Sequence, residues 1–172
     1  MNGSFDPYRL VNTYGAFGTV EEEREELIIE SAHDIQGPWK EYQFKVKPGD
    51  VSKGQRWISP YHYRLDWQMW IASCCGRIES SPWMFNFLLK LLKEDPKTLS
   101  LMKGNPWDVD GEGKEERVKP KYIRVDRYKY KYGERGDSYW IRTKSGRFFP
   151  KLGVCNVELL EEFVSSTKTV SY

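Results

Sequence analysis

Apolar and polar residues alternate along the first part of the chain, as they do in β-strands. In the segment KEYQFKVKPGD every second residue is apolar, and these residues share one face of a predicted strand: Tyr42, Phe44 and Val46. The PGD sequence that follows predicts a turn. A second strand is predicted from Glu26 in ELIIESAHD, because its β-branched pair Ile28-Ile29 suits a strand buried on both faces. We expect the two strands to pair as a hairpin.

The pattern becomes helical between residues 61 and 106. Apolar residues at i, i+3, i+4 and i+7 predict a core-facing stripe on a first helix: Trp67, Trp70, Ile71 and Cys74. A second helix is predicted to follow Ser81-Pro82, with Ser81 as its N-cap. The same spacing gives this helix its own core stripe: Phe85, Leu88, Leu89 and Leu92.

Asp95-Pro96 predicts a short third helix, which continues over Leu99 and Met102 and ends at Gly104. Residues 108–119 are polar and broken by glycine, so they predict a flexible loop.

Strand patterning returns over residues 121–150, with a change of register. Ile123 and Val125 are apolar at odd positions, whereas the tyrosines that follow stand at even ones: Tyr128, Tyr130 and Tyr132. One extra residue near Asp126-Arg127 would exchange the two faces, which predicts a β-bulge. Residues 133–137 read as a turn before the strand SYWIRTK. A last short helix is predicted from Asn156.

Strands, then helices, then strands is the order of an α+β protein. The length of 172 residues fits a single domain spanning 1–172. We expect an antiparallel β-sheet, either single or packed as a sandwich. A helical hairpin inserted between the strand blocks should cover one side, with a short helix at the C-terminus.

Charge is distributed unevenly although the net charge is only +2. Residues 1–35 hold eight acidic and two basic residues, a net charge of −6, whereas residues 117–151 hold twelve basic and three acidic, a net charge of +9. Opposite fields attract, so the two segments are expected to face each other. Separate solvated strand faces are the simpler alternative.

The basic segment KYIRVDRYKYKYGER alternates lysine or arginine with tyrosine, a pattern compatible with single-stranded nucleic acid. A half-buried strand gives the same alternation, and the low net charge favours that interpretation. We therefore expect no nucleic acid partner.

The three cysteines, Cys74, Cys75 and Cys155, do not form a metal or redox motif. CxxC spacing is absent, and His33 and His62 do not complete a zinc pattern, so no metal or cofactor is expected. A bridge between the neighbours Cys74 and Cys75 is disfavoured. A bridge from either of them to Cys155 remains open.

The longest apolar run, WMFNFLLKLL, contains Asn86 and Lys90 and falls short of the roughly 20 residues that cross a bilayer. The first ten residues lack the basic start and apolar stretch of a signal peptide. On its own, the sequence predicts a soluble chain.

The segment SPYHYRLDWQMW, from Ser59 to Trp70, is the strongest candidate site. Its candidate side chains are Tyr61, His62, Tyr63, Arg64, Asp66, Trp67 and Trp70. His62 and Asp66 could form a general acid–base pair, but no nucleophile stands in a fixed relation to them. The favoured interpretation is a structural joint, in which Asp66 caps the helix and Arg64 pairs with an acidic group of the first block.

Five segments together resemble the C-terminal domain of the lipase maturation factor family. They occur in this order over most of the chain: RLVNTYGAFG, EYQFKVKPGD, SPYHYRLDWQMW, GNPW and YIRVDRYKYKY. The resemblance implies a lumenal domain of an endoplasmic-reticulum membrane protein, with the membrane spans outside this sequence. It also implies protein clients, namely immature lipases such as lipoprotein lipase. It supplies no catalytic residues.

The segment LVNTYGAFG contains a tight-turn candidate formed by Tyr14, Gly15, Phe17 and Gly18. The two glycines permit the turn, and Phe17 packs in the core on the simplest interpretation. A turn that contacts a client is the second interpretation.

The sequence therefore favours a non-enzymatic folding and assembly factor for secreted lipases. A hydrolase or transferase using His62 and Asp66 is one alternative, and a carbohydrate- or nucleic-acid-binding β module is another. The particular client, the binding surface and the oligomeric state stay open, as does the question of whether this is a fragment or a free-standing form.

Overall fold

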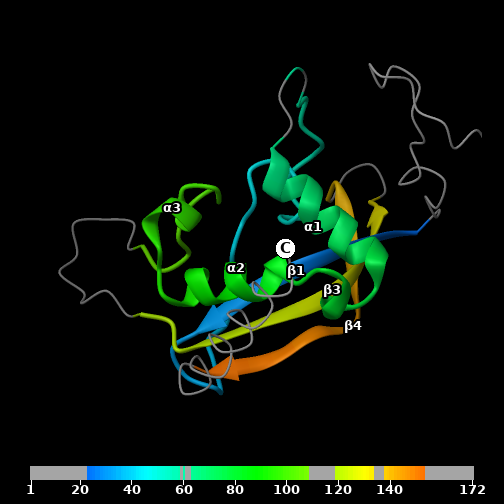
Figure 1. The fold of residues 1–172 in the computed structure, drawn as a ribbon. Coiled ribbons are helices and arrows are strands. Elements are labelled where there is room, and N and C mark those ends of the chain that lie inside the picture. Colours follow the sequence, from blue (N-terminus) through cyan, green and yellow to red (C-terminus); the bar gives the residue numbers. More distant parts are fainter. Residues whose placement is uncertain (1–22, 59, 61–62, 109–118, 134–137, 154–172) are drawn as a thin grey trace, which may run out of the picture.

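A four-stranded antiparallel sheet forms the body of the protein (Figure 1). The computed structural model describes residues 23–58, 60, 63–108, 119–133 and 138–153. The strands lie in the order β2-β1-β3-β4. In chain order the elements are β1 (Arg24–Ala32), β2 (Lys40–Glu41), α1 (Arg64–Cys75), the 3-10 turn η2 (Ile78–Ser80), α2 (Trp83–Leu92), α3 (Pro96–Leu99), β3 (Tyr122–Tyr132) and β4 (Trp140–Gly153). This confirms the α+β class and the antiparallel sheet.

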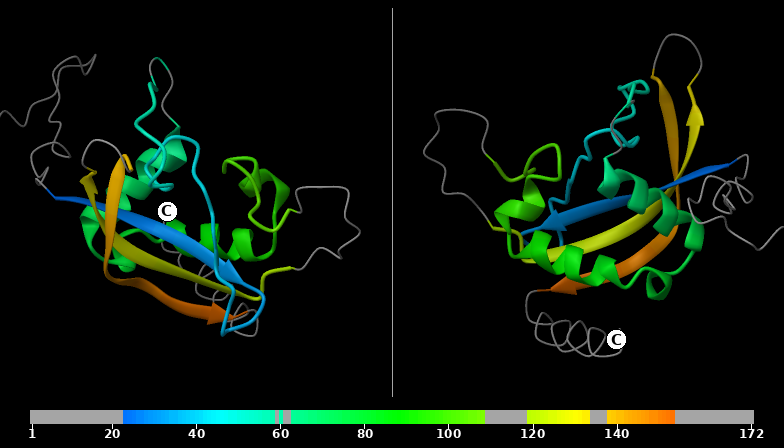
Figure 2. Two further views of the ribbon diagram at one scale, coloured as in Figure 1. Left: turned by 180° about the vertical axis from the view of Figure 1, so that it is seen from behind. Right: turned by 45° about the horizontal axis from the view of Figure 1, so that its top comes forward.

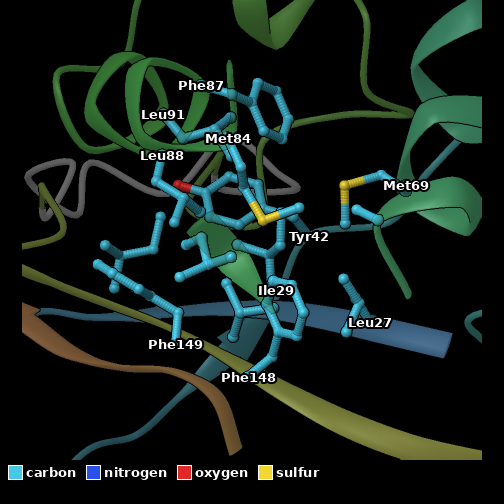
Figure 3. Packing of buried hydrophobic residues seen from close by; sticks show 14 of the residues in the cluster. Leu27, Ile29, Tyr42, Met69, Met84, Phe87, Leu88, Leu91, Phe148 and Phe149 are labelled. Atoms are coloured by element: carbon cyan, nitrogen blue, oxygen red, sulfur yellow. The ribbon is translucent and has the colours of Figure 1, made fainter. Parts of the chain in front are cut away.

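The main core lies between one face of the sheet and the helices (Figure 3). Met69 of α1 and Met84 and Leu88 of α2 meet Leu27 and Ile29 of β1, and all five side chains are buried. The two β1 residues stand two apart, so both point to the helical side. The stripe predicted for α2 is confirmed, since three of its members are buried and the fourth, Phe85, packs edge-on against a phenylalanine of β4.

A smaller cluster occupies the opposite face of the sheet and contains Ile28, Tyr130 and Trp140. Their polar atoms are satisfied by the chain that follows β2. The Tyr130 hydroxyl donates to the carbonyl of Gly49 at 2.9 Å, and the Trp140 indole N–H donates to the carbonyl of Lys53 at 3.0 Å. Strand β1 is thus buried on both faces, as its sequence predicts.

The predicted β-bulge lies in the neighbouring strand. Strand β3 pairs with β1 without interruption, from Arg24 opposite Tyr130 to Ala32 opposite Tyr122. The register shifts occur between β3 and β4, and the additional residues stand on β4, which bends strongly (Figure 2). No exchange of faces is needed in β3, because each of its faces packs its own apolar residues: Ile123 and Val125 on one, and buried Tyr130 with half-buried Tyr128 on the other.

The described part of the acidic first segment faces the described part of the basic third segment, as their opposite charges predict. Three ion pairs join β1 and the residue before it to β3: Glu23–Lys129, Glu25–Arg127 and Glu30–Arg124. The last two have N···O distances of 3.1 and 2.7 Å. Electrostatic complementarity therefore reinforces the antiparallel pairing of two strands that lie about a hundred residues apart in the sequence.

The strand predicted over Tyr42, Phe44 and Val46 is wrong beyond its first residues. Strand β2 ends at Glu41, although its hairpin-like pairing with β1 is confirmed. Tyr42 still donates its N–H to Ile29, and Tyr42 and Phe44 are buried in the core. The chain then leaves β1, because the N–H groups of Val46 and Lys47 bind a carboxylate of α1 instead of the strand.

Other predictions on the helices are met in part. The N-cap of α2 is Pro82, without a side-chain cap from Ser81. Asp95 caps α3 by accepting from the Thr98 N–H at 2.8 Å, but the helix ends at Leu99 and Met102 is buried beyond it. Neither a sandwich nor a helical hairpin is confirmed, since the described strands form one sheet and η2 separates α1 from α2. The predicted 108–119 loop, 133–137 turn and helix from Asn156 lie wholly or mostly outside the described residues.

Candidate functional site

A groove of about 950 Å³ lies between α1 and residues 43–58, and the start of β1 forms its floor with Arg127 and Lys129 of β3. Figure 1 shows the chain of residues 43–58, in cyan, running beside α1. Four segments of the chain, with β3 distant in sequence from the other three, therefore build one concave surface. A groove of this size is within the range of ligand-binding pockets.

The wall of the groove on the α1 side is aromatic and defines what we call the aromatic wall: Tyr63, Trp67 and Trp70. The two indoles lie 5.0 Å apart between ring centroids, and Trp67 is 37% exposed. Beyond the opposite edge stands Trp57, which is 89% exposed, and its neighbour Ile58 lines the groove. Exposed aromatic side chains gathered at a concave surface form an apolar patch, which is typical of a binding site.

The predicted core stripe of Trp67, Trp70, Ile71 and Cys74 is therefore wrong. Its members are exposed or half-buried, whereas the helix turns Met69, Ala72 and Ser73 toward the sheet. Both sets have helical spacing and are offset by about one residue. The small side chains of Ala72 and Ser73 let α1 lie close to β1, and the Ser73 hydroxyl donates to the Glu25 carbonyl at 3.0 Å.

Asp66 fastens the two walls together. One carboxylate oxygen, Oδ1, accepts from the backbone N–H of Val46 at 2.8 Å and of Lys47 at 2.9 Å, and the residue is 5% exposed. The predicted helix cap is wrong, since Asp66 lies inside the first turn and the N-cap is Tyr63 without a side-chain bond. A structural joint is nonetheless what Asp66 forms, with the 43–58 segment as its partner.

Eight cations line the groove, and four of them form what we call the cationic rim: Lys45, Lys53, Arg56 and Lys103. The Lys45 ammonium donates to the Ser100 carbonyl at 2.7 Å and lies 5.7 Å from the ring centroid of Tyr63. Among the described ion pairs, only Lys53 of these four takes part, with Asp50 at 3.0 Å. The rim therefore carries excess positive charge.

The remaining predicted site residues divide into two groups. Arg64 is exposed and joins no ion pair among the described residues, so its predicted acidic partner is not found there. Six others lie outside the described residues: Tyr14, Gly15, Phe17, Gly18, Tyr61 and His62. The contact of His62 with Asp66 and the turn around Phe17 thus stay predictions.

Sequence reasoning missed Trp57, Ile58 and the cationic rim. A signal for the first two is present, because the apolar pair in GQRWIS interrupts a polar segment that predicts no element. The rim gives no such signal, since Lys103 stands some fifty residues from Lys53 and Arg56 and meets them only through the fold. The backbone N–H of Lys103 donates to the carbonyl of Gln43 at 2.9 Å, and this bond places Lys103 at the groove.

Asp50 is expected to titrate far below an ordinary aspartate. The Ser52 hydroxyl and N–H donate to its carboxylate at 2.6 and 3.0 Å, and with Lys53 they lower its pKa from 3.8 to about 2. A lowered pKa in the folded state stabilises the turn above about pH 4 and loses this effect as the pH falls toward 2. NMR titration of the Asp50 carboxyl should show this value, and Ser52→Ala should raise it. A wild-type pKa of 3.8 would contradict the turn geometry.

Comparison with known proteins identifies the chain's relatives. The family model described as the lipase maturation factor C-terminal domain matches residues 10–150. The chain belongs to the lipase maturation factor family. The groove thus lies in a lipase maturation factor C-terminal domain, as the five resembling segments imply.

Named relatives support the same assignment over nearly the whole chain. The chain is 40% identical to lipase maturation factor 1 of Bos taurus over 163 residues, which cover 88% of this chain and 28% of the relative. It is 40% identical to lipase maturation factor 1 of Mus musculus over 174 residues, which cover 95% of this chain and 28% of the relative. It is 36% identical to lipase maturation factor 2 of Mus musculus over 168 residues, which cover 94% of this chain and 23% of the relative. The chain thus spans about a quarter of the length of these relatives.

No solved structure matches this lipase maturation factor domain. In the part of the chain that the structure describes, no helix has the length and apolar character to cross a bilayer. Within the same ranges, no three histidine, cysteine or acidic side chains gather as metal ligands.

Proposed function

We propose that this domain binds immature secreted lipases, lipoprotein lipase among them, in the lumen of the endoplasmic reticulum and helps them to fold and assemble. The contact is non-covalent, and the groove beside α1 is the client-binding surface. Membership of the lipase maturation factor family supports the client class. The relatives are some four times longer, and client contact is the part of their activity that we assign to this domain.

The observation that carries this proposal is the aromatic wall. A single-domain protein gains stability by burying tryptophan, yet α1 directs its small residues inward and leaves Trp67 and Trp70 at the groove. Exposed aromatic side chains in a concave site are the groups that dominate binding energy between proteins. An unfolded or partly folded client exposes the apolar side chains that such a wall accepts.

The role of Asp66 supports binding rather than catalysis. Its Oδ1 atom holds two backbone N–H groups, and the side chain is 5% exposed, so it is committed to the joint between the groove walls. A general base must reach a proton of its substrate. The hydrolase alternative also needs His62, which lies outside the described residues.

The double variant Trp67→Ala/Trp70→Ala tests the proposal. The tagged 172-residue chain, directed to the lumen, should capture newly made lipoprotein lipase from co-expressing cells, whereas mature lipase is captured less. Losing both anchors should reduce capture by about thirtyfold or more, because even one such anchor contributes roughly 2 kcal/mol.

The matched control is Trp39→Ala, which removes a half-buried tryptophan outside the groove, where it lies over Arg124. It should leave capture unchanged if the melting temperature is kept. Equal capture by wild type and the doubly substituted groove variant, with both folded, would refute the groove as the client site.

A further inference from the structure

The charges of the groove are unequal on its two sides. On the side of the sheet, the cations of β3 are neutralised by carboxylates, Lys129 by Glu23 and Arg127 by Glu25. On the side of residues 43–58, Asp50 is the one carboxylate of the described residues that forms an ion pair with the cationic rim. The excess positive charge is therefore confined to one edge.

The rim is built into the fold, since its members are held by specific contacts. Lys45 is fixed through the Ser100 carbonyl, Arg56 Nη1 donates to the Lys45 carbonyl at 3.4 Å, and the backbone of Lys103 is bound to Gln43. A hydrogen bond with the Lys53 ammonium group lowers the pKa of Lys103, and the positive charges of Lys53 and Arg56 lower it further. Like charges held together in this way gain from an anion that joins them.

The aromatic wall and the cationic rim line the same groove. Trp67 and Trp70 form one side, and Ile58 continues the apolar surface toward Arg56. A ligand that spans the groove must therefore offer both apolar surface and negative charge. A volume of about 950 Å³ is far larger than a free phosphate requires and suits several residues of a peptide.

We propose that the groove binds an extended acidic–apolar segment of a polypeptide, with large apolar side chains on the aromatic wall and Asp or Glu carboxylates on the cationic rim. This inference rests on the proposed client-binding function and adds the chemical class of the segment that is recognised. Carboxylates make charge-assisted hydrogen bonds with lysine and arginine, which select such segments over neutral ones of equal hydrophobicity.

Three fluorescein-labelled peptides test this class, and each is titrated with the 172-residue chain by fluorescence anisotropy. The first contains Asp and Glu between Leu and Phe, the second replaces each acid by its amide, and the third replaces each acid by lysine. The acidic peptide should bind about tenfold more tightly than the amide peptide and more tightly still than the lysine peptide. Salt raised from roughly 50 to roughly 500 mM should reduce this preference.

The double variant Arg56→Gln/Lys103→Gln should reduce the preference for acidic over amide peptide to about twofold or less. Its control is Lys97→Gln, which removes an exposed cation of α3 outside the groove and should change nothing. Equal binding of the acidic and amide peptides, or a preference that survives in the rim variant, would overturn the inference. So would displacement of the acidic peptide by millimolar inorganic phosphate, or phosphatidylserine vesicles binding through the rim while the peptide does not.

The two proposals can fail separately. Capture of lipase without any preference for the acidic peptide would overturn the inference that the groove binds an acidic segment, and it would leave the proposed function unaffected. A rim-dependent preference for the acidic peptide without capture of lipase would support the segment chemistry and overturn lipase as the client.

Discussion

Glu26→Gln is expected to lower the free energy of unfolding by about 3 kcal/mol. The Glu26 carboxylate and the Lys47 ammonium group lie 3.0 Å apart, with side chains 1% and 4% exposed. Removing one charge of a buried pair leaves the other without compensation, which typically costs about 3–5 kcal/mol. The amide oxygen of glutamine and the Pro48 carbonyl, 3.1 Å from the ammonium nitrogen, keep the expected loss near the lower end.

Urea unfolding of four variants measures this effect. Lys47→Met removes the other charge and should also destabilise the protein, whereas the double variant Glu26→Gln/Lys47→Met should lose less than the sum of the single losses. Arg24→Gln is the control, because Arg24 bonds the same carboxylate at 2.8 Å but is 41% exposed, so its loss should stay below about 1 kcal/mol. Strictly additive single losses, or a Glu26→Gln loss no larger than that of Arg24→Gln, would contradict a coupled buried pair.

This ion pair matters for the groove because it holds the 43–58 segment against the sheet. Lys47 belongs to that segment, and Glu26 belongs to β1. The same two residues of the segment, Val46 and Lys47, give their N–H groups to Asp66 of α1. The groove is thus lined by a strand, a helix and a loop, and the buried carboxylates of Glu26 and Asp66 hold the loop against the strand and the helix.

Local pattern was sufficient to predict the elements that bury a complete apolar face. The strand from Glu26, helix α2 and the strand of Ile123 and Val125 all follow their hydrophobic spacing. The opposed charges of the first and third blocks predict that these blocks face each other, and β1 and β3 pair directly. In these elements the residue pattern and the tertiary contacts favour the same structure.

Prediction failed where a polar side chain redirected the chain. The alternation of apolar and polar residues through Val46 is that of a strand. However, the Asp66 carboxylate is a stronger acceptor for the Val46 N–H group than a backbone carbonyl of β1 is. In α1, two stripes offset by one residue both have helical spacing, and apolar character alone selects the tryptophans. Buried Ala72 allows α1 to lie close to β1, and this tertiary contact cannot be predicted from the spacing of apolar residues.

The candidate site was accordingly predicted in part. Trp67, Trp70 and Asp66 were singled out, and all three line the groove, but the reasons given for them were a core stripe and a helix cap. The cationic rim was missed because its lysines and arginine come from two loops on either side of the helical block, and charge on a loop usually means only solvation.

Asp66→Ala is expected to destabilise the domain by about 3 kcal/mol and to open the groove. The change leaves the N–H groups of Val46 and Lys47 without their acceptor, and an unsatisfied buried donor costs about 1–3 kcal/mol. Hydrogen exchange followed by NMR should show both amides protected in the wild type and exchanging much faster in the variant, because the carboxylate is the acceptor that both have among the described residues. Binding of the acidic peptide should fall with the loss of the groove wall.

Asp66→Asn separates this joint from any chemical role of the carboxylate. Asparagine keeps an oxygen in the place of Oδ1, so the two amides should stay largely protected and the destabilisation should be less than half of that in Asp66→Ala. An acid–base catalyst would respond in the opposite way, since the amide removes the titrating group while keeping the shape. Fast exchange of both amides in the asparagine variant, or equal protection in the alanine variant, would show that the segment is held by something other than this oxygen.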